Sequence, residues 1–313
     1  MKPTASGRSW RKRSTVVALC AALAIPATAC SSQSPQGGSG ANGHTGKSGE
    51  ASLYNASIAK MLPNGFPKGK TVTIPTDATY PPDQLKSSSG AIIGLDPDLG
   101  HAIGQVLGLK FDFVDAPFDS IIPGVVSGKW LISMTADENT PEREKVVDFV
   151  TAWKTGLSFM VPASSSVSIK KGTDVCGLKV GINKGNIAYE LLQQASKKCV
   201  AGGHPAIALT QFPGQDAVNL AMQSGRVQAT CADEMTLAYT AQKTHGQMKL
   251  EPYTFATATE GIVVKKNSHL LRPLQAALKY LIKQGTYRDI FARWNVSRAM
   301  IDNPQIFPAS SRS

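Results

Sequence analysis

The stretch from residue 94 to residue 128, GLDPDLGHAIGQVLGLKFDFVDAPFDSIIPGVVSG, predicts a helix, a strand and a second helix in succession. Asp96 is placed to cap the first helix, with Pro97 at its first helical position. A strand follows, because apolar residues alternate with polar ones at Leu109, Phe111 and Phe113. A second apolar helical face ends at Gly128. This order of elements indicates an α/β fold.

The alternation of strands and helices continues on both sides of this stretch. Residues 71–75 form a predicted strand, and residues 80–82, YPP, form a loop because proline cannot continue it. A second series starts with a strand at residues 179–182 and includes a strand around Cys231. The last long helical pattern contains Leu270, Leu274, Leu278 and Leu281. Two series with a late return predict two lobes, each a mostly parallel sheet flanked by helices, with a ligand cleft between them.

We expect the chain to divide into four parts. Residues 1–29 combine five basic residues with a short apolar run and no acid, which predicts a signal peptide. Residues 30–66 are predicted to form a flexible tether, because this segment begins with a run of Gly, Ser, Pro and polar residues. The first lobe is predicted from residues 67–161 and 258–313, and the second from residues 162–257.

Residues 27–30, ATAC, precede the polar run and resemble the lipobox of bacterial lipoproteins, in which the cysteine is acylated and becomes the first residue. The resemblance implies a lipid such as palmitate on Cys30, which would anchor the protein at the extracytoplasmic face of the cell membrane. The alternative is ordinary signal cleavage with a free N-terminus. Both alternatives place the chain outside the cytoplasm.

Three cysteines, Cys176, Cys199 and Cys231, follow the leader and Cys30. In an oxidising compartment, one disulfide and one buried free thiol are expected from this number. Cys176 and Cys199 flank a strand and a helix that bring their ends together, whereas Cys231 lies in a strand of small and apolar residues. We therefore predict a disulfide between Cys176 and Cys199.

The charge of the chain excludes a nucleic-acid footprint. The sequence has 33 Lys and Arg against 22 Asp and Glu, and five of the basic residues lie in the leader. No basic run follows residue 13. The five histidines are scattered, and neither Cys-x-x-Cys nor His-Glu-x-x-His occurs, so we predict no metal site and no cofactor.

Residues 139–144, NTPERE, predict an anion site. Thr140 is a good N-cap and Pro141 a good first helical residue, which places Arg143 in the first turn. A helix N-terminus attracts anions, and the guanidinium adds a planar, two-pronged donor that suits a carboxylate. The alternative is a surface arginine paired with a neighbouring glutamate.

Several short segments resemble, in order and spacing, those of the polar-amino-acid solute-binding proteins of ABC importers, family 3. They are residues 76–82 (TDATYPP), 94–99 (GLDPDL), 118–123 (FDSIIP), 127–129 (SGK), 140–143 (TPER), 147–149 (VDF) and 224–226 (SGR). The resemblance runs from about residue 71 to residue 296, and its Cys-Gly start of the second lobe is similar to lipoprotein members from high-GC Gram-positive bacteria. It implies a type II clamp that closes as a monomer on one amino acid and delivers it to a permease.

The resemblance also implies roles for particular residues. Arg143 matches the arginine that binds the ligand's α-carboxylate, and Asp233 matches the acid that binds its α-ammonium. Tyr80 and Phe118 match the aromatics that cover the ligand side chain, with Asp77 at its far end. The remaining ligand-binding residues are expected in the second lobe: Asn183, and Gly185, Asn186 and Ile187 at a helix N-terminus. This set suits arginine, lysine, ornithine or a glutamine-like side chain.

Glu138 departs from the family, which usually has Ser or Thr at that position. One interpretation turns Glu138 outward or pairs it with a nearby cation. The other places it in the cleft, where it would compete with a ligand carboxylate at Arg143 or join Asp233 around an ammonium. The second interpretation predicts a ligand richer in positive charge than a simple zwitterion, including a small diamine-like solute.

Two other functions use the same fold. A few proteins with this clamp are dehydratases, but Glu138 is the only unusual acid placed to act, and no nucleophile motif occurs, so we predict no enzyme. The clamp is also used as an amino-acid sensor for a membrane signalling partner, and the sequence does not separate sensing from transport.

Overall fold

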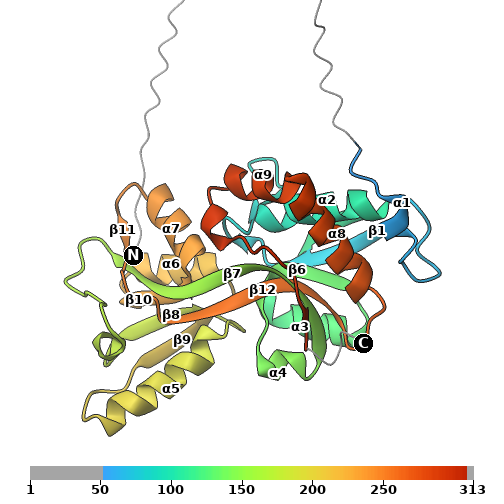
Figure 1. The fold of residues 1–313 in the computed structure, drawn as a ribbon. Coiled ribbons are helices and arrows are strands. Elements are labelled where there is room, and N and C mark those ends of the chain that lie inside the picture. Colours follow the sequence, from blue (N-terminus) through green and yellow to red (C-terminus); the bar gives the residue numbers. More distant parts are fainter. Residues whose placement is uncertain (1–51, 309–313) are drawn as a thin grey trace, which may run out of the picture. The chain divides into compact units, whose positions relative to one another are not determined.

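The computed structural model describes residues 52–308 of the 313-residue chain. Its first strands form small sheets (Figure 1). β1 (Thr71–Thr76) pairs in parallel with β5 (Lys110–Asp115). β2 (Thr79–Tyr80), β3 (Gln84–Lys86) and β4 (Ile92–Ile93) form an antiparallel sheet in the loop that separates them.

The larger sheet has the strand order β6, β12, β7, β10, β8, β9. Its strands are β6 (Ile132–Glu138), β7 (Val147–Pro162), β8 (Lys179–Asn183), β9 (Ala208–Phe212), β10 (Ala229–Asp233) and β12 (Ala256–Lys265). β11 (Met248–Leu250) and β13 (Ile306–Phe307) also pair with β7. Figure 1 shows β7 and β12 as long neighbouring strands, and they are antiparallel. The sheet is therefore mixed rather than mostly parallel, because only β8, β9 and β10 keep the parallel pairing.

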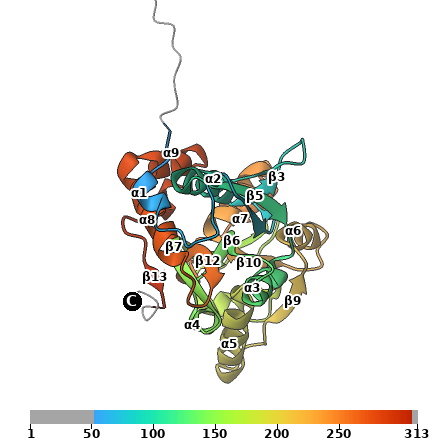
Figure 2. The same cartoon turned by 90° about the vertical axis from the view of Figure 1, so that its right-hand side faces the viewer.

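The helices expected from apolar periodicity are present with adjusted ends, whereas residues 56–59, 141–144 and 234–243 form helices that this periodicity does not predict. The helices are α1 (Ala56–Ala59), α2 (Leu95–Leu107), α3 (Phe118–Ser127), α4 (Pro141–Glu144), α5 (Ala188–Ala201), α6 (Gln215–Gln223), α7 (Glu234–Lys243), α8 (Leu271–Gln284) and α9 (Thr286–Arg293). Two 3₁₀ turns, Gly172–Val175 and Ser297–Ala299, complete the set in the described part of the chain. Figure 2 shows α1, α2, α8 and α9 gathered together, and contacts join them.

Two large apolar cores divide along β7. The first core packs α2, α8 and α9 against β1 and includes Ile74, Trp153 and Phe291. The second core packs α5 against β8 and β10 and includes Leu157 and Phe159. Burial of each such side chain contributes about 1.5–3 kcal/mol relative to exposure. β7 leaves one core after Trp153 and enters the other at Leu157, so one strand joins the two packed regions.

Part of the predicted tether is packed rather than free. Residues 1–51, with the predicted signal peptide, Cys30 and the start of the tether, lie outside the described residues. Residues 52–66 were expected to continue the tether, but they contain α1, capped by Asn55 through bonds from the Ser57 and Ile58 N–H groups. Leu53, Ile58, Leu62 and Phe66 pack on the first core. The apolar side chains of this segment are half-buried, so it is attached to the first core although much of it stays exposed.

Asp96 does not cap α2, which corrects the prediction made from Asp96 and Pro97. α2 begins at Leu95 after Gly94, whose φ of 145° suits glycine. Asp96 is fully buried, and its Oδ2 accepts a hydrogen bond from the Ala136 N–H at 3.1 Å. The carboxylate therefore fixes β6 to α2 instead of satisfying the helix end.

The cysteine prediction is confirmed. Cys176 and Cys199 form a disulfide with a Cα–Cα distance of 5.7 Å. Cys231 is a buried free thiol in β10. The disulfide joins the start of the β8 segment to α5 and thereby fixes one side of the second core.

Candidate functional site

Arg143 is held on the short helix α4 as the sequence predicts. Thr140 is the N-cap, and its Oγ1 accepts a hydrogen bond from the Arg143 N–H at 3.2 Å. The Arg143 side chain is 11% exposed, and Nη2 donates to the Gly185 carbonyl at 3.1 Å. Its guanidinium lies 5.5 Å from the centre of the Phe118 ring. The structure therefore brings Arg143, Phe118 and Gly185 together.

Glu138 is buried and bound to Arg143. Its side chain has no exposed area, and Arg143 Nη1 donates to Glu138 Oε2 at 2.8 Å and to the Glu138 carbonyl at 2.9 Å. Asp137 Oδ1 lies 3.8 Å from Nη1 of the same guanidinium. Pairing with a nearby cation is thus confirmed, whereas an outward orientation is wrong. The cation is the arginine predicted to hold a ligand carboxylate.

Asp233 is the centre of the second group of contacts. The Tyr80 hydroxyl donates to Asp233 Oδ2 at 2.5 Å and accepts from the Asp233 N–H at 2.9 Å. Thr155 Oγ1 donates to Asp233 Oδ1 at 2.6 Å. Asn186 Nδ2 reaches the same Tyr80 hydroxyl at 3.4 Å. The predicted residues Tyr80, Asn186 and Asp233 are therefore neighbours, although Tyr80 contacts the acid with its hydroxyl.

Asp77 and Asn183 also meet, from segments 106 residues apart. Asn183 Nδ2 donates to Asp77 Oδ2 at 3.0 Å, and Thr79 donates to Asp77 Oδ1. Burial is the main reason why the pKa of Asp77 is raised. Beside this pair, Lys184 forms an ion pair with Asp119 at 2.7 Å. These contacts connect the ends of β1 and β8 across the site.

Gly185, Asn186 and Ile187 precede α5, as predicted. α5 begins at Ala188 with Ile187 as its N-cap residue, and the Ala188 N–H donates to Asn186 Oδ1 at 2.8 Å. Gly185 has a φ of 89°, and a Cβ there would lie 3.2 Å from Phe118 and Asp119. Glycine is therefore required where α5 approaches α3. The side chain of Ile187 packs on the second core.

Glu260 is a site residue that the sequence analysis missed. It stands opposite Glu138 in the β12–β6 ladder and is fully buried. It also lies within hydrogen-bonding reach of Asp233, yet neither of its oxygens has a donor. Burial, together with the charges of Asp233, Asp83 and Glu138, holds the pKa of Glu260 well above its usual range. A glutamate directly before the apolar strand segment GIVV (residues 261–264) was the available sequence signal.

The other acids of the site show the same electrostatic effect. Burial raises the pKa of Glu138 to about 7 and that of Asp137 to about 6, although Arg143 opposes both shifts. Burial also raises the pKa of Asp233. Two carboxyl groups in contact without a donor need a shared proton or a cation between them. The site is therefore short of positive charge.

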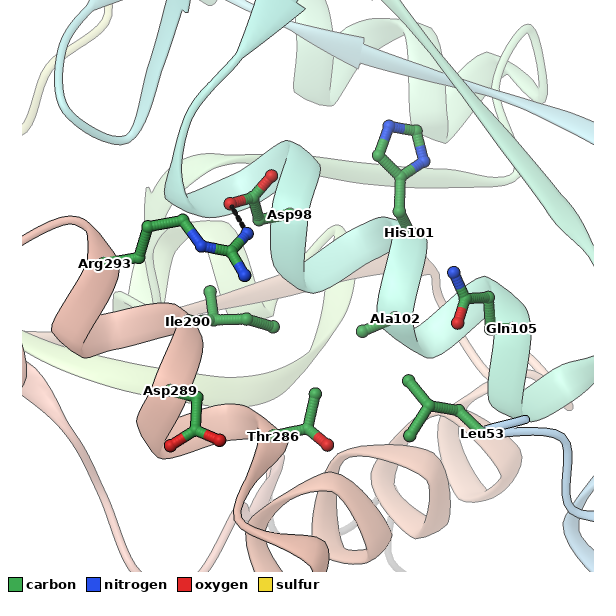
Figure 3. Close-up of a pocket in the computed structure, with 9 residues that line it drawn as sticks. All are labelled: Leu53, Asp98, His101, Ala102, Gln105, Thr286, Asp289, Ile290 and Arg293. Carbon is green, nitrogen blue, oxygen red and sulfur yellow. Dashed lines mark hydrogen bonds and ion pairs between the residues drawn. The ribbon is translucent and has the colours of Figure 1, made fainter. Parts of the chain in front are cut away.

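A pocket elsewhere in the fold contains none of the predicted binding residues (Figure 3). Its volume is about 470 Å³, and it lies between α2 and α9, where Arg293 donates to Asp98 at 2.8 Å. Within residues 52–308, no group of His, Cys, Asp and Glu side chains is arranged to hold a metal ion. The helices of that same range are all too short or too polar to cross a bilayer.

The fold and the site define a class of protein. Segments that are far apart in the chain meet around buried charged and aromatic side chains, which is the arrangement of a clamp for a small polar ligand. The family of bacterial extracellular solute-binding proteins, family 3, matches residues 72–297. The chain belongs to this family. Because the family consists of solute-binding proteins, the prediction that the chain is not an enzyme is confirmed.

Several named relatives are similar over most of their length. The arginine-binding protein ArgT of Corynebacterium glutamicum is 26% identical, covering 80% of this chain and 82% of its own. The L-arginine-binding protein of Pseudomonas aeruginosa is 28% identical, covering 72% and 88%. A solved ancestral arginine-binding protein bound to arginine is 33% identical, with a TM-score of 0.66 over 73% of this chain and 99% of that chain. These matches confirm the type II fold.

Proposed function

We propose that this chain binds a cationic amino acid, with arginine as the first candidate, and delivers it to an ABC importer in the membrane. The names of its relatives support arginine, since ArgT and the Pseudomonas protein are both called arginine-binding proteins. The carrying observation is that Arg143 and Asp233 lie in one buried site, close enough for their charges to interact. A zwitterion that leaves water needs a partner for each charge.

Closure of two lobes is the proposed mechanism. Residues 67–161 with 258–313 form one lobe and residues 162–257 the other. Arg143–Gly185, Asn183–Asp77 and Tyr80–Asp233 each join residues of both lobes. A ligand that contacts both lobes favours the closed state and shifts the population toward it. The ligand-binding set comprises Asp77, Tyr80, Phe118, Glu138, Arg143, Asn183, Gly185, Asn186, Ile187 and Asp233.

A lipid on Cys30 is the proposed anchor. Together with the tether up to about residue 51, it would keep the clamp near its permease at high effective concentration. Palmitate labelling of the expressed chain tests this directly. We expect labelling of the natural chain and none after Cys30→Ala; equal labelling of both would exclude the anchor.

A thermal-shift screen over the twenty amino acids tests the proposed function. A ligand at 100 times its Kd stabilises the protein by about 2.7 kcal/mol, which is several degrees in Tm. We expect the largest shift with arginine, a much smaller one after Asp233→Ala, and an unchanged shift after Arg293→Ala, whose guanidinium pairs with Asp98 outside the site. No shift with any amino acid would refute the function.

A further inference from the structure

Three of the five N–H donors of Arg143 are already used by the protein. Nη1 donates twice to Glu138, and Nη2 donates to the Gly185 carbonyl. Arginine has five N–H donors in a rigid fork, and a ligand carboxylate requires two that are parallel. A ligand carboxylate at the two remaining donors would share the single positive charge of Arg143 with Glu138 and Asp137.

Glu138 has no alternative partner for its charge. Its side chain is fully buried, and its only ion pair among residues 52–308 is with Arg143. Releasing Glu138 from Arg143 would leave one more buried carboxylate without a cation, which is strongly unfavourable. The favourable interaction that a ligand carboxylate gains at Arg143 would be matched by the interaction that Glu138 loses there. The carboxylate therefore contributes little net affinity.

The opposite side of the site lacks positive charge. Asp233 and Glu260 are within hydrogen-bonding reach of each other, and Glu138 faces Glu260 across the ladder. Glu260 is fully buried with both oxygens lacking a donor, and one oxygen of Glu138 also has none. These unpartnered oxygens do not depend on the position of Arg143. An ammonium or guanidinium, which carries only donors, satisfies them.

We propose that this site recognises its ligand by positive charge alone, so that cationic amines without a free carboxylate bind at least as well as the corresponding amino acids. The ligand class is a diamine or an amine with a guanidinium, of which decarboxylated arginine (agmatine) is the test case. Glu138 already neutralises the guanidinium of Arg143, which makes a ligand carboxylate dispensable. This inference rests on the proposed function, since it concerns the same clamp.

Calorimetric titration of the purified full-length chain separates the two proposals. The probes are arginine, arginine amide, agmatine and glutamine. We expect agmatine and arginine amide to bind within threefold of arginine or more tightly, and glutamine to bind at least 30-fold more weakly. If arginine binds and agmatine is 100-fold weaker, the inference is wrong while the proposed function stands. If none of the four binds, both are wrong.

Substitutions at Glu138 provide the second readout. Glu138→Thr introduces the residue type usual in the family and frees Arg143, so arginine should become at least tenfold tighter than agmatine. Glu138→Gln removes the charge with nearly the same shape and should weaken agmatine about tenfold. The matched control is Glu142→Gln on α4, where the side chain is exposed and both affinities should stay within twofold. An unchanged ratio of arginine to agmatine affinity in Glu138→Thr would overturn the inference.

Discussion

Two buried acid–base pairs near α4 differ in how their charges are balanced. Asp148 accepts from Lys266 Nζ at 2.8 Å and from the Asn267 N–H at 2.7 Å, so each oxygen of this acid has a donor. Glu138 and Asp137 both depend on Arg143, and Glu138 also faces Glu260. The first arrangement holds the chain together, whereas the second leaves negative charge that a ligand can neutralise. The excess of acid is thus what distinguishes a binding site from a structural ion pair.

Removing the cation from each pair should produce the largest contrast. Arg143→Ala should lower the free energy of unfolding by roughly 3–5 kcal/mol at pH 7.5, because two buried acids lose their cation. The affinity for a cationic ligand should stay equal or rise, because the excess of acid in the site increases. Lys266→Ala should cost less stability, since the Asn267 N–H still serves Asp148, and should leave affinity within threefold. Urea denaturation and calorimetry measure both. Loss of binding in the Lys266 variant would contradict the distinction.

Asp233→Asn should affect binding without harming the fold. We expect ligand affinity to fall by about 1.5–3 kcal/mol, the contribution of one charged hydrogen bond, in a calorimetric titration. The free energy of unfolding should remain equal or rise, because the repulsion between Asp233 and Glu260 disappears. Thr155 and Tyr80 donate to different oxygens of Asp233, so Asn keeps an acceptor for only one hydroxyl, and this loss offsets part of the gain in stability. A variant that binds as tightly as the natural chain would place the ligand cation elsewhere.

The free energy of unfolding should fall as pH rises through the range in which Glu138 and Asp137 ionise. The pKa of Glu138 is raised from 4.5 to about 7 and that of Asp137 from 3.8 to about 6, so the folded state keeps protons that the unfolded chain has released. Arg143 opposes these shifts, while the neighbouring Asp233 adds to that of Glu138. Between pH 5 and pH 7.5 the free energy of unfolding should decrease by about 4 kcal/mol.

Urea denaturation at the two pH values measures this change, and a saturating cationic ligand should reduce it. Glu138→Gln should also make it smaller, because one of the titrating groups is gone. Stability that increases from pH 5 to pH 7.5 would show that these carboxylates are ionised and satisfied without a ligand, as Asp148 is in its structural pair.

Tyr80→Phe should have the smallest effect and sharpen the role of Asp233. The Tyr80 hydroxyl binds both the carboxylate and the N–H of Asp233, so its removal should lower the free energy of unfolding by about 1 kcal/mol. Because the hydroxyl no longer competes for Asp233, ligand affinity should increase about threefold. Chemical denaturation checks the expected loss of stability, and calorimetry checks the expected gain in affinity. Weaker binding in Tyr80→Phe would indicate that the hydroxyl contacts the ligand.

The sequence predicts local features of the site well because neighbouring residues form them. Thr140 and Pro141 mark the start of α4, and the residues before Ala188 mark the start of α5. The disulfide follows from the strand and helix between its cysteines. Family resemblance adds Tyr80 and Asp233, which lie 153 residues apart and could not be paired from local pattern.

Other features depend on contacts between distant strands. Asp96 is a good cap by sequence, yet a backbone N–H of β6 takes its carboxylate. The orientation of Glu138 depends on Arg143 and on the register of β6 with β12, which also brings in Glu260. No local pattern encodes that register, because the two glutamates are far apart in the chain. The acid excess therefore became visible only in the structure.

A crystal structure of the full-length chain with arginine bound would test the central claim most directly. The account predicts that Glu138 stays on Arg143 at about 3 Å and that a cationic group of the ligand contacts Asp233 and Glu260. A ligand α-carboxylate bound through two parallel hydrogen bonds to Arg143, with Glu138 turned away, would contradict it.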